Sequence, residues 1–402
     1  MGLTIGFDIS QTGESKAGCG YFAYSLIQTL AECDDENEYV LYPTFGSSFW
    51  DPNGRSSIVS VKKDNFGLGL SHSTLEEMRN FWLNPAPDFE SKIGQPQVIH
   101  ANNFFCPRGI QSARVVYTLY DLGFLHYPEF ATEMNRITCF SGVFDASLYA
   151  DFIIAISEHS RKDFLDIFPH YPKDRVVVVH LASRFKMNEN LRQPESVSFL
   201  RSKQFWLNVG TIEPRKNHRR LVRAYAKLCS DMPDMFPLVL AGGKGWMMDD
   251  LVELIEDLSL GDRVILLGYV DDLTLQWLYQ SCFAFVYPSL FEGFGLPVLE
   301  ALNLGAPVIT SGTSSLPEVV GDAGILVDPE DEDQIYSAMR RLIKGEVNRQ
   351  MLIQRGLDRA RQFSWATVAK AVKEIYEQVG TGTPRRNTCA ANPAARENRA
   401  DI

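Results

Sequence analysis

Two glutamates and two basic residues have the types and the spacing to bind one ligand that carries both hydroxyl and phosphate groups. Glu292 and Glu300 are separated by seven residues, and Arg215 and Lys216 are neighbours in the chain. Carboxylates accept hydrogen bonds from sugar hydroxyls, whereas arginine and lysine neutralise phosphate oxygens. A nucleotide sugar combines both groups. The simpler alternative is that Glu292 is a solvated loop residue, that Glu300 complements a helix dipole and that the two cations are exposed.

The loop that contains Glu292 can also bring backbone N–H groups close to such a ligand. It follows an apolar strand pattern, and Pro297 suits the first turn of the helix that comes next. Gly293 and Gly295 let the main chain approach a ligand without an intervening side chain. The start of a helix offers unpaired N–H groups to anionic oxygens. The loop therefore predicts an anion site beside Glu292.

Short apolar, β-branched runs alternate with helix-length segments along most of the chain. Such alternation needs crossover connections, so it predicts an α/β fold of two doubly wound domains with mostly parallel sheets. In such sheets ligands bind beyond the carboxyl ends of the strands, which is where the glutamates and the cations fall. The predicted strands are Leu3–Ile9, Tyr39–Tyr42, Val98–His100, Val115–Leu119, Phe152–Ser157, Val176–Val179, Phe205–Val209, Leu238–Ala241, Val264–Leu267, Phe283–Tyr287, Val308–Thr310 and Ile325–Val327.

The apolar periodicity lapses once in the middle of the chain, and this lapse divides it. We expect a first domain over residues 1–182, a linker over 183–204 and a second domain over 205–364. A helix over 365–380 is expected to return toward the first domain. The tail over 381–402 lacks periodicity, so we expect it to be disordered.

The composition limits the kinds of partner. A formal net charge of -11 argues against a nucleic-acid binder, because phosphate backbones require clustered cations. The 7 cysteines are scattered without a C-x-x-C pair, which suggests neither a zinc site nor a disulfide framework and indicates a reducing compartment. No apolar run reaches the roughly 20 residues that span a bilayer, so we expect a cytoplasmic protein, with peripheral contact at the inner face of the membrane left open. The aromatic-rich stretch Phe45–Phe89 either faces an acceptor or a membrane, or forms a small hydrophobic cluster under long loops.

In combination, four segments of the second half resemble GT-B glycosyltransferases of family 4. The two glutamates seven residues apart are the recurring mark of that family. The resemblance covers essentially the whole second domain, and it implies two Rossmann-like domains facing a central cleft and a retaining transfer reaction. The segments are Val209–Asn217, Ala241–Gly245, Gly268–Val270 and Pro288–Ala301.

The resemblance also implies roles for individual residues. Glu292 is expected at the donor sugar, Glu300 at the ribose and Lys216, with Arg215, at the diphosphate. The turn at Tyr269 and Val270 is expected at the base. Many relatives carry Gly-Arg where this chain has Gly-Thr, so Arg215 would have to supply that positive charge. The full set of residues expected at the donor is Gly18, Gly20, Gly210, Thr211, Tyr269, Val270, Gly293, Phe294, Gly295, Leu296 and Glu300.

The first half offers a weaker glycine signal. Gly13, Gly18 and Gly20 lie between the first predicted strand and a helix expected to begin near Tyr21. This loop either passes close to donor phosphates or is a plain strand-to-helix turn.

The segment Val115–Glu129 resembles the family strand that ends in a His-Asp pair at the reacting sugar. Tyr120 occupies the position of that histidine, Asp121 is retained, and His126 is either a substitute or a surface loop residue. Ser157 lies in a turn that also resembles the family, and we expect it to cap a helix and, with Tyr120, to lie on the acceptor side. The catalytic candidates are Asp121, His126, Arg215, Lys216 and Glu292.

The acidic triplet Asp331–Asp333 matches a D-x-D metal motif, but its place before a helix favours capping. We therefore expect no metal and no other cofactor. The expected reaction moves a hexosyl group from a nucleotide sugar to a saccharide or a lipid-linked saccharide. GDP-mannose is the first donor to consider, because the Thr-x-Glu-Pro-Arg-Lys-Asn form of the motif resembles bacterial mannosyltransferases of cell-surface polysaccharide assembly. Two alternatives remain open, a nucleotide-sugar epimerase or hydrolase on the same scaffold and a non-catalytic nucleotide-sugar-binding protein.

Overall fold

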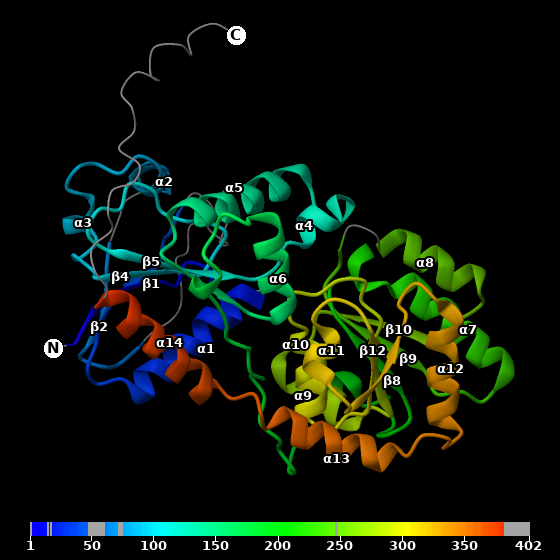
Figure 1. Ribbon diagram of the computed structural model, residues 1–402. Helices are drawn as coiled ribbons and strands as arrows, with labels where there is room; N and C mark the ends of the chain where they lie inside the picture. Colours follow the sequence, from blue (N-terminus) through cyan, green and yellow to red (C-terminus); the bar gives the residue numbers. More distant parts are fainter. Residues whose placement is uncertain are drawn as a thin grey trace, which may run out of the picture.

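The computed structural model describes residues 2–13, 16, 18–46, 61–70, 75–245 and 248–381. The strands within them form two sheets in which every pair of neighbours is parallel. Each sheet with the helices around it makes up one lobe, and the lobes lie side by side (Figure 1). The predicted α/β fold with two doubly wound parallel sheets is confirmed.

The first lobe contains a sheet of seven strands in the order β3-β2-β1-β4-β5-β6-β7. Its direction of winding reverses between β1 and β4, which leaves a crevice beyond the carboxyl ends of these two strands. The strands are β1 (Thr4–Asp8), β2 (Glu38–Tyr42), β3 (Phe66–Leu68), β4 (Val98–Ala101), β5 (Arg114–Leu119), β6 (Phe152–Ala155) and β7 (Val176–Val178). The short strand β3 was not predicted.

The second lobe contains a sheet of six strands in the order β10-β9-β8-β11-β12-β13, with the corresponding reversal between β8 and β11. Its loops at the reversal hold the basic pair and Glu292. The strands are β8 (Trp206–Val209), β9 (Leu238–Ala241), β10 (Val264–Gly268), β11 (Ala284–Tyr287), β12 (Val308–Ser311) and β13 (Gly324–Val327).

The helices cover the sheets. Those of the first lobe are α1 (Gly18–Cys33), α2 (Leu75–Leu83), α3 (Phe89–Lys92), α4 (Gly123–His126), α5 (Glu133–Tyr149) and α6 (Glu158–Ile167). Those that follow are α7 (His218–Asp231), α8 (Met248–Asp257), α9 (Asp272–Ser281), α10 (Leu296–Asn303), α11 (Leu316–Val320), α12 (Glu332–Ile343), α13 (Arg349–Ala360) and α14 (Trp365–Gly380). Short 3-10 turns lie at Pro128–Phe130, Lys173–Arg175, Glu195–Val197 and Pro214–Lys216.

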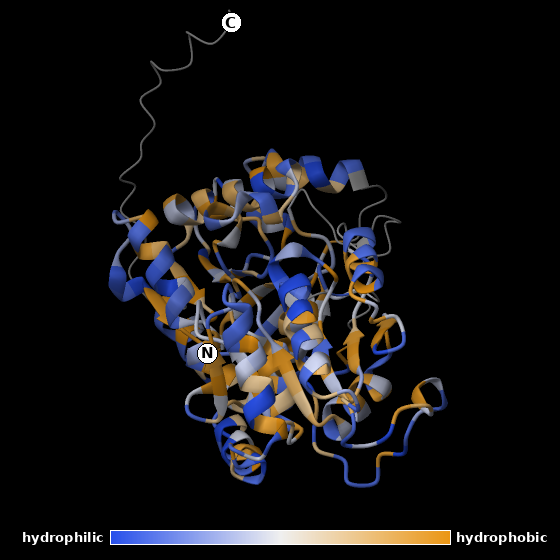
Figure 2. Cartoon of the chain, turned by 90° about the vertical axis from the view of Figure 1, so that its right-hand side faces the viewer, coloured by the Kyte–Doolittle hydropathy of each residue, from blue (hydrophilic) through white to orange (hydrophobic). Residues whose placement is uncertain are grey.

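Hydrophobic side chains fill the space between sheets and helices. In Figure 2 the strands are mostly orange, whereas many helices alternate blue and orange along their length, as amphipathic helices do. Helix α1 begins at Gly18 and not near Tyr21, so Gly18 and Gly20 belong to its first turn. A Cβ atom on Gly20 would lie 2.0 Å from the Gln11 carbonyl oxygen, so this helix start needs glycine for its close packing.

The last helix packs on the first lobe although it follows the second lobe in sequence. Helix α14 lies beside α1 and against β4 (Figure 1). Val372 and Tyr376 on it are fully buried, and the Tyr376 hydroxyl lies 2.6 Å from His100 Nδ1. The chain therefore passes between the lobes twice, once after β7 and once between α13 and α14.

Four of the described aromatic residues between Phe45 and Phe89, namely Phe45, Phe81, Trp82 and Phe89, pack in one hydrophobic cluster, whereas Phe66 stacks on Tyr39 in another. Phe45, Trp82 and Phe89 are at most 4% exposed, and the ring centroids of Phe45 and Trp82 are 4.3 Å apart. Of the two alternatives for this stretch, the structure shows the hydrophobic cluster for these residues. Residues 47–60 and 71–74 lie outside the described part of the chain. The predicted disorder of the tail likewise concerns residues 382–402, which are outside it. No helix in the described part of the chain is long and apolar enough to cross a membrane.

Candidate active site

A cavity of about 530 Å³ lies between the lobes at the carboxyl ends of their strands. The first lobe contributes the start of α1 and the end of β5, and the second lobe contributes the loops after β8 and β11 and the start of α10. Thirteen of the residues expected at the catalytic, donor or acceptor sites line it: Gly18, Tyr120, Asp121, Gly210, Thr211, Arg215, Lys216, Glu292, Gly293, Phe294, Gly295, Leu296 and Glu300.

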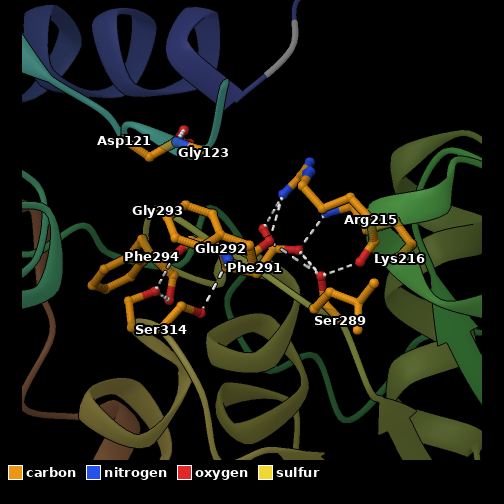
Figure 3. Close-up of polar contacts among 12 residues, drawn as sticks. Asp121, Gly123, Arg215, Lys216, Ser289, Phe291, Glu292, Gly293, Phe294 and Ser314 are labelled. Atoms are coloured by element: carbon orange, nitrogen blue, oxygen red, sulfur yellow. Dashed lines mark hydrogen bonds and ion pairs between the residues drawn. The ribbon is translucent and has the colours of Figure 1, made fainter. Parts of the chain in front are cut away.

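Glu292 is the centre of a dense polar cluster on one wall of this cavity. Lys216 Nζ donates to Glu292 Oε1 at 2.6 Å, and Arg215 Nη1 donates to Oε2 at 2.8 Å (Figure 3). The hydroxyls of Tyr287 and Ser289 also donate to Oε1, at 2.8 Å and 2.6 Å. The carboxylate is 6% exposed, so these four donors replace the water that it loses on burial.

The cluster keeps Glu292 ionised. Burial acts to raise the pKa of Glu292, but the charges of Arg215 and Lys216 and the hydrogen bonds from Lys216 and Ser289 outweigh it and lower the pKa to about 2. Burial and the neighbouring Arg215 lower the pKa of Lys216, although Glu292 opposes this. Burial would also lower the pKa of Arg215, but Glu292 and Glu213 raise it above its ordinary value. An ionised carboxylate that accepts hydrogen bonds from Arg215 and Lys216 therefore faces the cavity at neutral pH.

The loop after Glu292 places a helix start beside this cluster. Gly295 is the N-terminal cap residue of α10, its φ of 106° lies in the left-handed region, and it makes no side-chain cap hydrogen bond. Pro297 follows in the first turn. Pro297 has no N–H, and the Val298 N–H donates to the Gly295 carbonyl oxygen at 3.0 Å, so within α10 it is the Leu296 N–H that can reach an anion in the cavity, together with the N–H groups of the glycine loop before it.

Glu300 lies one turn further along α10. Arg184 Nε donates to its Oε1 at 2.9 Å, and the Tyr279 hydroxyl donates to its Oε2 at 3.2 Å. Glu300 is 5% exposed, and burial raises its pKa against the opposing influence of Arg184 and Tyr279. Glu300 is therefore a buried carboxylate, and each of its two oxygens accepts a hydrogen bond from a side chain.

Across the cavity, the first lobe presents Tyr120 and Asp121. Asp121 Oδ1 accepts from the Gly123 N–H at 2.9 Å, and burial raises the pKa of Asp121 although Arg215 acts to lower it (Figure 3). The Tyr120 hydroxyl donates to the Asn102 carbonyl oxygen at 2.8 Å. Tyr120 is thus fixed by a main-chain acceptor.

Five of the residues named from the sequence do not line the cavity. His126 Nε2 lies 3.0 Å from Asp163 Oδ2 on the surface, and its ring lies against Phe291. Ser157 is fully buried and caps α6 by accepting from the Ser160 N–H. Tyr269 is 77% exposed. The remaining two are Gly20, which packs on Gln11, and Val270.

The cavity also contains residues that the sequence did not single out. Arg184 lies in the segment expected to be only a linker, and Tyr21 and Trp365 lie in amphipathic helices. Tyr287 and Ser289 do not line the cavity, but their hydroxyls donate to Glu292, which does. A tyrosine at the end of a strand, followed two residues later by a serine that stands three residues before Glu292, is a local signal for Tyr287 and Ser289. No comparable signal marks Arg184.

The acidic triplet at the start of α12 lies outside the cavity. Asp331 caps this helix, with its Oδ1 accepting from the N–H groups of Asp333 at 2.9 Å and Gln334 at 3.1 Å. Within the described residues no group of three or more His, Cys, Asp and Glu side chains could hold a metal ion.

Known proteins of similar sequence and fold bear on this geometry. The family model of group 1 glycosyl transferases matches residues 192–359. O-antigen chain mannosyltransferase B of Escherichia coli is 34% identical over 380 residues, which cover 90% of this chain and 96% of that protein.

Two solved structures share the fold over most of their length. Sucrose-phosphate synthase from Thermosynechococcus elongatus matches with a TM-score of 0.73 at 21% identity, covering 94% of this chain and 99% of that one. Anabaena HepE, solved in complex with UDP-glucose, matches with a TM-score of 0.66 at 18% identity, covering 94% and 100%. The chain belongs to the group 1 glycosyltransferases and is a hexosyltransferase of the GT-B fold, similar to the O-antigen mannosyltransferases.

Proposed function

We propose that the enzyme transfers a mannosyl group from GDP-mannose to a hydroxyl of a saccharide or lipid-linked saccharide, with retention at the anomeric carbon. The observation that carries the proposal is the junction of Glu292, Lys216 and Arg215 with the uncapped start of α10 in one cavity. The name of the Escherichia coli relative supports mannose as the sugar.

In this proposal the donor diphosphate lies between the cations and the amides of residues 293–296. Arg215, Lys216 and the α10 N-terminus stabilise the negative charge that grows on the leaving nucleoside diphosphate. Glu292 accepts from hydroxyls of the sugar and Glu300 from those of the ribose. The bond from the anomeric carbon to the phosphate oxygen breaks while the acceptor oxygen bonds to the same face, and a donor phosphate oxygen takes the acceptor proton.

The two lobes have separate parts in this proposal. The unit over residues 205–364 holds the donor, the unit over 1–182 holds the acceptor beside Tyr120 and Asp121, and residues 183–204 connect them. Closure of the cleft excludes water, which favours transfer over hydrolysis. Neutralisation of the diphosphate by side chains and amides needs no metal. The proposed site of action is the cytoplasm, at the inner face of the membrane when the acceptor is lipid-linked.

A panel of ligands tests the donor. We expect GDP and GDP-mannose to raise the unfolding temperature of the purified enzyme more than UDP and UDP-glucose do, because a ligand of the folded state stabilises it. A larger shift with UDP compounds would contradict the choice of guanine and leave the transferase proposal standing. Release of free mannose with every acceptor tried, and no glycosylated product, would instead indicate a hydrolase.

Two variants test the cluster. We expect Glu292→Gln and Lys216→Met each to reduce transfer by roughly 10²- to 10³-fold, because each removes charge at the reacting centre. Lys162→Met replaces an exposed lysine of α6 and serves as the control. Circular dichroism and thermal unfolding show whether each variant folds. Near-normal turnover in both folded cluster variants would overturn the proposal.

A further inference from the structure

Arg184 lies between the lobes, and the sequence predicted no role for it. It lies in the segment that leaves β7 for the second lobe, and it lines the cavity that holds the polar cluster. Its side chain is only 19% exposed. A buried arginine needs partners that compensate its charge, so its contacts indicate what it does.

Those contacts join both lobes. Its Nε donates to Glu300 on α10 at 2.9 Å, and its Nη1 lies 3.1 Å from Asp272 on α9. The guanidinium carbon lies 4.1 Å from the ring centroid of Tyr21, which belongs to α1 of the first lobe. Figure 1 shows α1 in the first lobe and α9 and α10 in the second. Stacking on a tyrosine face is a favourable arrangement for arginine.

The contact with Glu300 fixes how that carboxylate faces the cavity. Arg184 holds Oε1 and the Tyr279 hydroxyl holds Oε2, so both oxygens have a fixed place. A carboxylate has about four lone-pair sites, so two donors leave acceptor capacity for hydroxyls of a ligand. Without Arg184, Glu300 would be a buried charge with one neutral donor, and burial already raises its pKa.

We propose that Arg184 is a positioning residue for the nucleoside part of the donor. It orients Glu300 toward the ribose and, by stacking on Tyr21, joins the first lobe to the nucleoside end of the cleft. This inference rests on the proposed function, because it takes Glu300 as the ribose-binding residue. The diphosphate end, held by Arg215 and Lys216, does not depend on Arg184.

The proposal predicts that loss of Arg184 weakens the binding of one ligand and not of another, whereas loss of a purely structural ion pair would affect both alike. GDP carries a ribose and a base, whereas inorganic pyrophosphate carries only the charged part. In Arg184→Met we expect the Kd of GDP to rise about tenfold or more, and the Kd of pyrophosphate to change less than about twofold. In steady-state assays the donor KM should rise while kcat changes less than about threefold, because the lost contact is made equally in the ground and transition states.

A double-mutant cycle shows whether Arg184 acts through Glu300. Once Glu300→Gln is present, adding Arg184→Met should weaken GDP binding less than twofold further, whereas independent residues would give multiplied effects. Arg184→Lys keeps the charge but loses the planar stack and the Nε donor, so it should restore part of the GDP affinity. Arg192→Met, an exposed arginine of the same segment, is the matched control and should bind GDP as the wild type does.

Several outcomes overturn the inference. Equal weakening of GDP and pyrophosphate in Arg184→Met, multiplied effects in the cycle, or unchanged GDP binding would each do so. If Arg184→Met alone does not fold, the test uses two other proteins. One is Arg184→Lys, and the other is the double variant with Arg184→Met and Glu300→Gln, which leaves no unpaired buried charge. A wild-type enzyme that binds no nucleoside diphosphate would refute the proposed function itself, which is a different result.

Discussion

A Cβ atom on Gly293 would lie 2.6 Å from the main-chain oxygen of Tyr120. The two residues come from different lobes, so at this point the loop after β11 touches the end of β5 backbone to backbone. The same imaginary atom would lie 2.9 Å from the Asp121 Cβ. Only a residue without a side chain permits this approach of the lobes.

Gly293→Ala should therefore hold the cleft partly open without unfolding either lobe. Crowding by one methyl group costs about 1–3 kcal/mol, which, if it falls on the closed state, corresponds to a loss of roughly fivefold to 150-fold in kcat. Gly261→Ala is the control, because no atom lies within 4 Å of the added Cβ. Steady-state kinetics of both variants measure the effect, and equal activity in the two would show that this contact is dispensable.

Glu318 of α11 caps a helix of the other lobe. Its Oε1 accepts from the Glu158 N–H at 2.8 Å at the start of α6, and it also contacts His180. Although burial opposes the shift, the hydrogen bond from His180 and the amides of α6 lower the pKa of Glu318. Glu318→Gln should destabilise the closed arrangement by about 1 kcal/mol through loss of the charge–dipole interaction. Small-angle scattering of the ligand-free enzyme should show a larger radius of gyration, whereas the exposed Glu374→Gln should not change it.

A buried chain of hydrogen bonds connects α14 with the wall of the cavity. Thr118 Oγ1 donates to Asn102 Oδ1, so His100 Nε2, 2.8 Å from Thr118 Oγ1, must carry the proton. His100 Nδ1 then accepts from the Tyr376 hydroxyl. Burial lowers the pKa of His100 to about 3. We expect nitrogen NMR shifts to report the neutral Nε2–H tautomer at pH 5, and a protonated ring at that pH would contradict the assignment.

Tyr376→Phe removes the donor that satisfies His100 Nδ1. A buried acceptor left unpaired costs about 1–3 kcal/mol, so the free energy of unfolding in urea should fall by that amount. Tyr336→Phe removes a hydroxyl at the surface and should change it by less than about 0.5 kcal/mol. If the two variants are equally stable, the chain of hydrogen bonds contributes nothing to the attachment of α14.

Asp8 should make stability depend on pH. Burial raises its pKa from 3.8 to about 7, although hydrogen bonds from Ser10 and Asn102 oppose the shift. Between these values the folded state binds a proton that the unfolded state has released. The contribution of protonated Asp8 to the free energy of unfolding is therefore complete below pH 3.8, and it is lost as the pH rises through 7.

Asp8→Asn removes this titration. The substitution also removes one hydrogen-bond acceptor, which lowers the free energy of unfolding by the same amount at every pH. The wild type should therefore lose up to about 4 kcal/mol relative to the variant between pH 4 and pH 8. Urea unfolding of both proteins across this range measures the difference, and parallel curves would show that Asp8 does not titrate in this window.

The sequence predicted the strands that position the site because their apolar, β-branched runs are unambiguous. Once the parallel sheets were assigned, the basic pair and Glu292 had to follow strands at the same sheet edge, and the structure brings them within 2.8 Å. Ser157 caps α6 as expected. Asn217, which precedes α7, makes no cap hydrogen bond: its Oδ1 accepts from Arg220 Nη1, and its Nδ2 donates to the carbonyls of Pro288 and Pro329.

Elements with mixed patterns were missed. Helix α5 buries Val143 and Ala146 yet exposes larger apolar side chains such as Met134, Ile137 and Phe144, so no apolar stripe marks its buried face. Arg184 was missed for a different reason. Its partners lie more than eighty residues away in the chain, and only the folded arrangement of both lobes brings them together.

The two passages of the chain between the lobes touch each other. Trp365 Nε1 donates to the Ser183 carbonyl oxygen at 3.2 Å, so the second passage is fastened to the first. Because two neighbouring connections join the lobes, one lobe can rotate about the line through these connections. It cannot slide along the other lobe or turn freely, as it could on a single connection. We therefore expect the lobes to separate by rotation about one axis, so that closing brings the same pairs of residues back into contact.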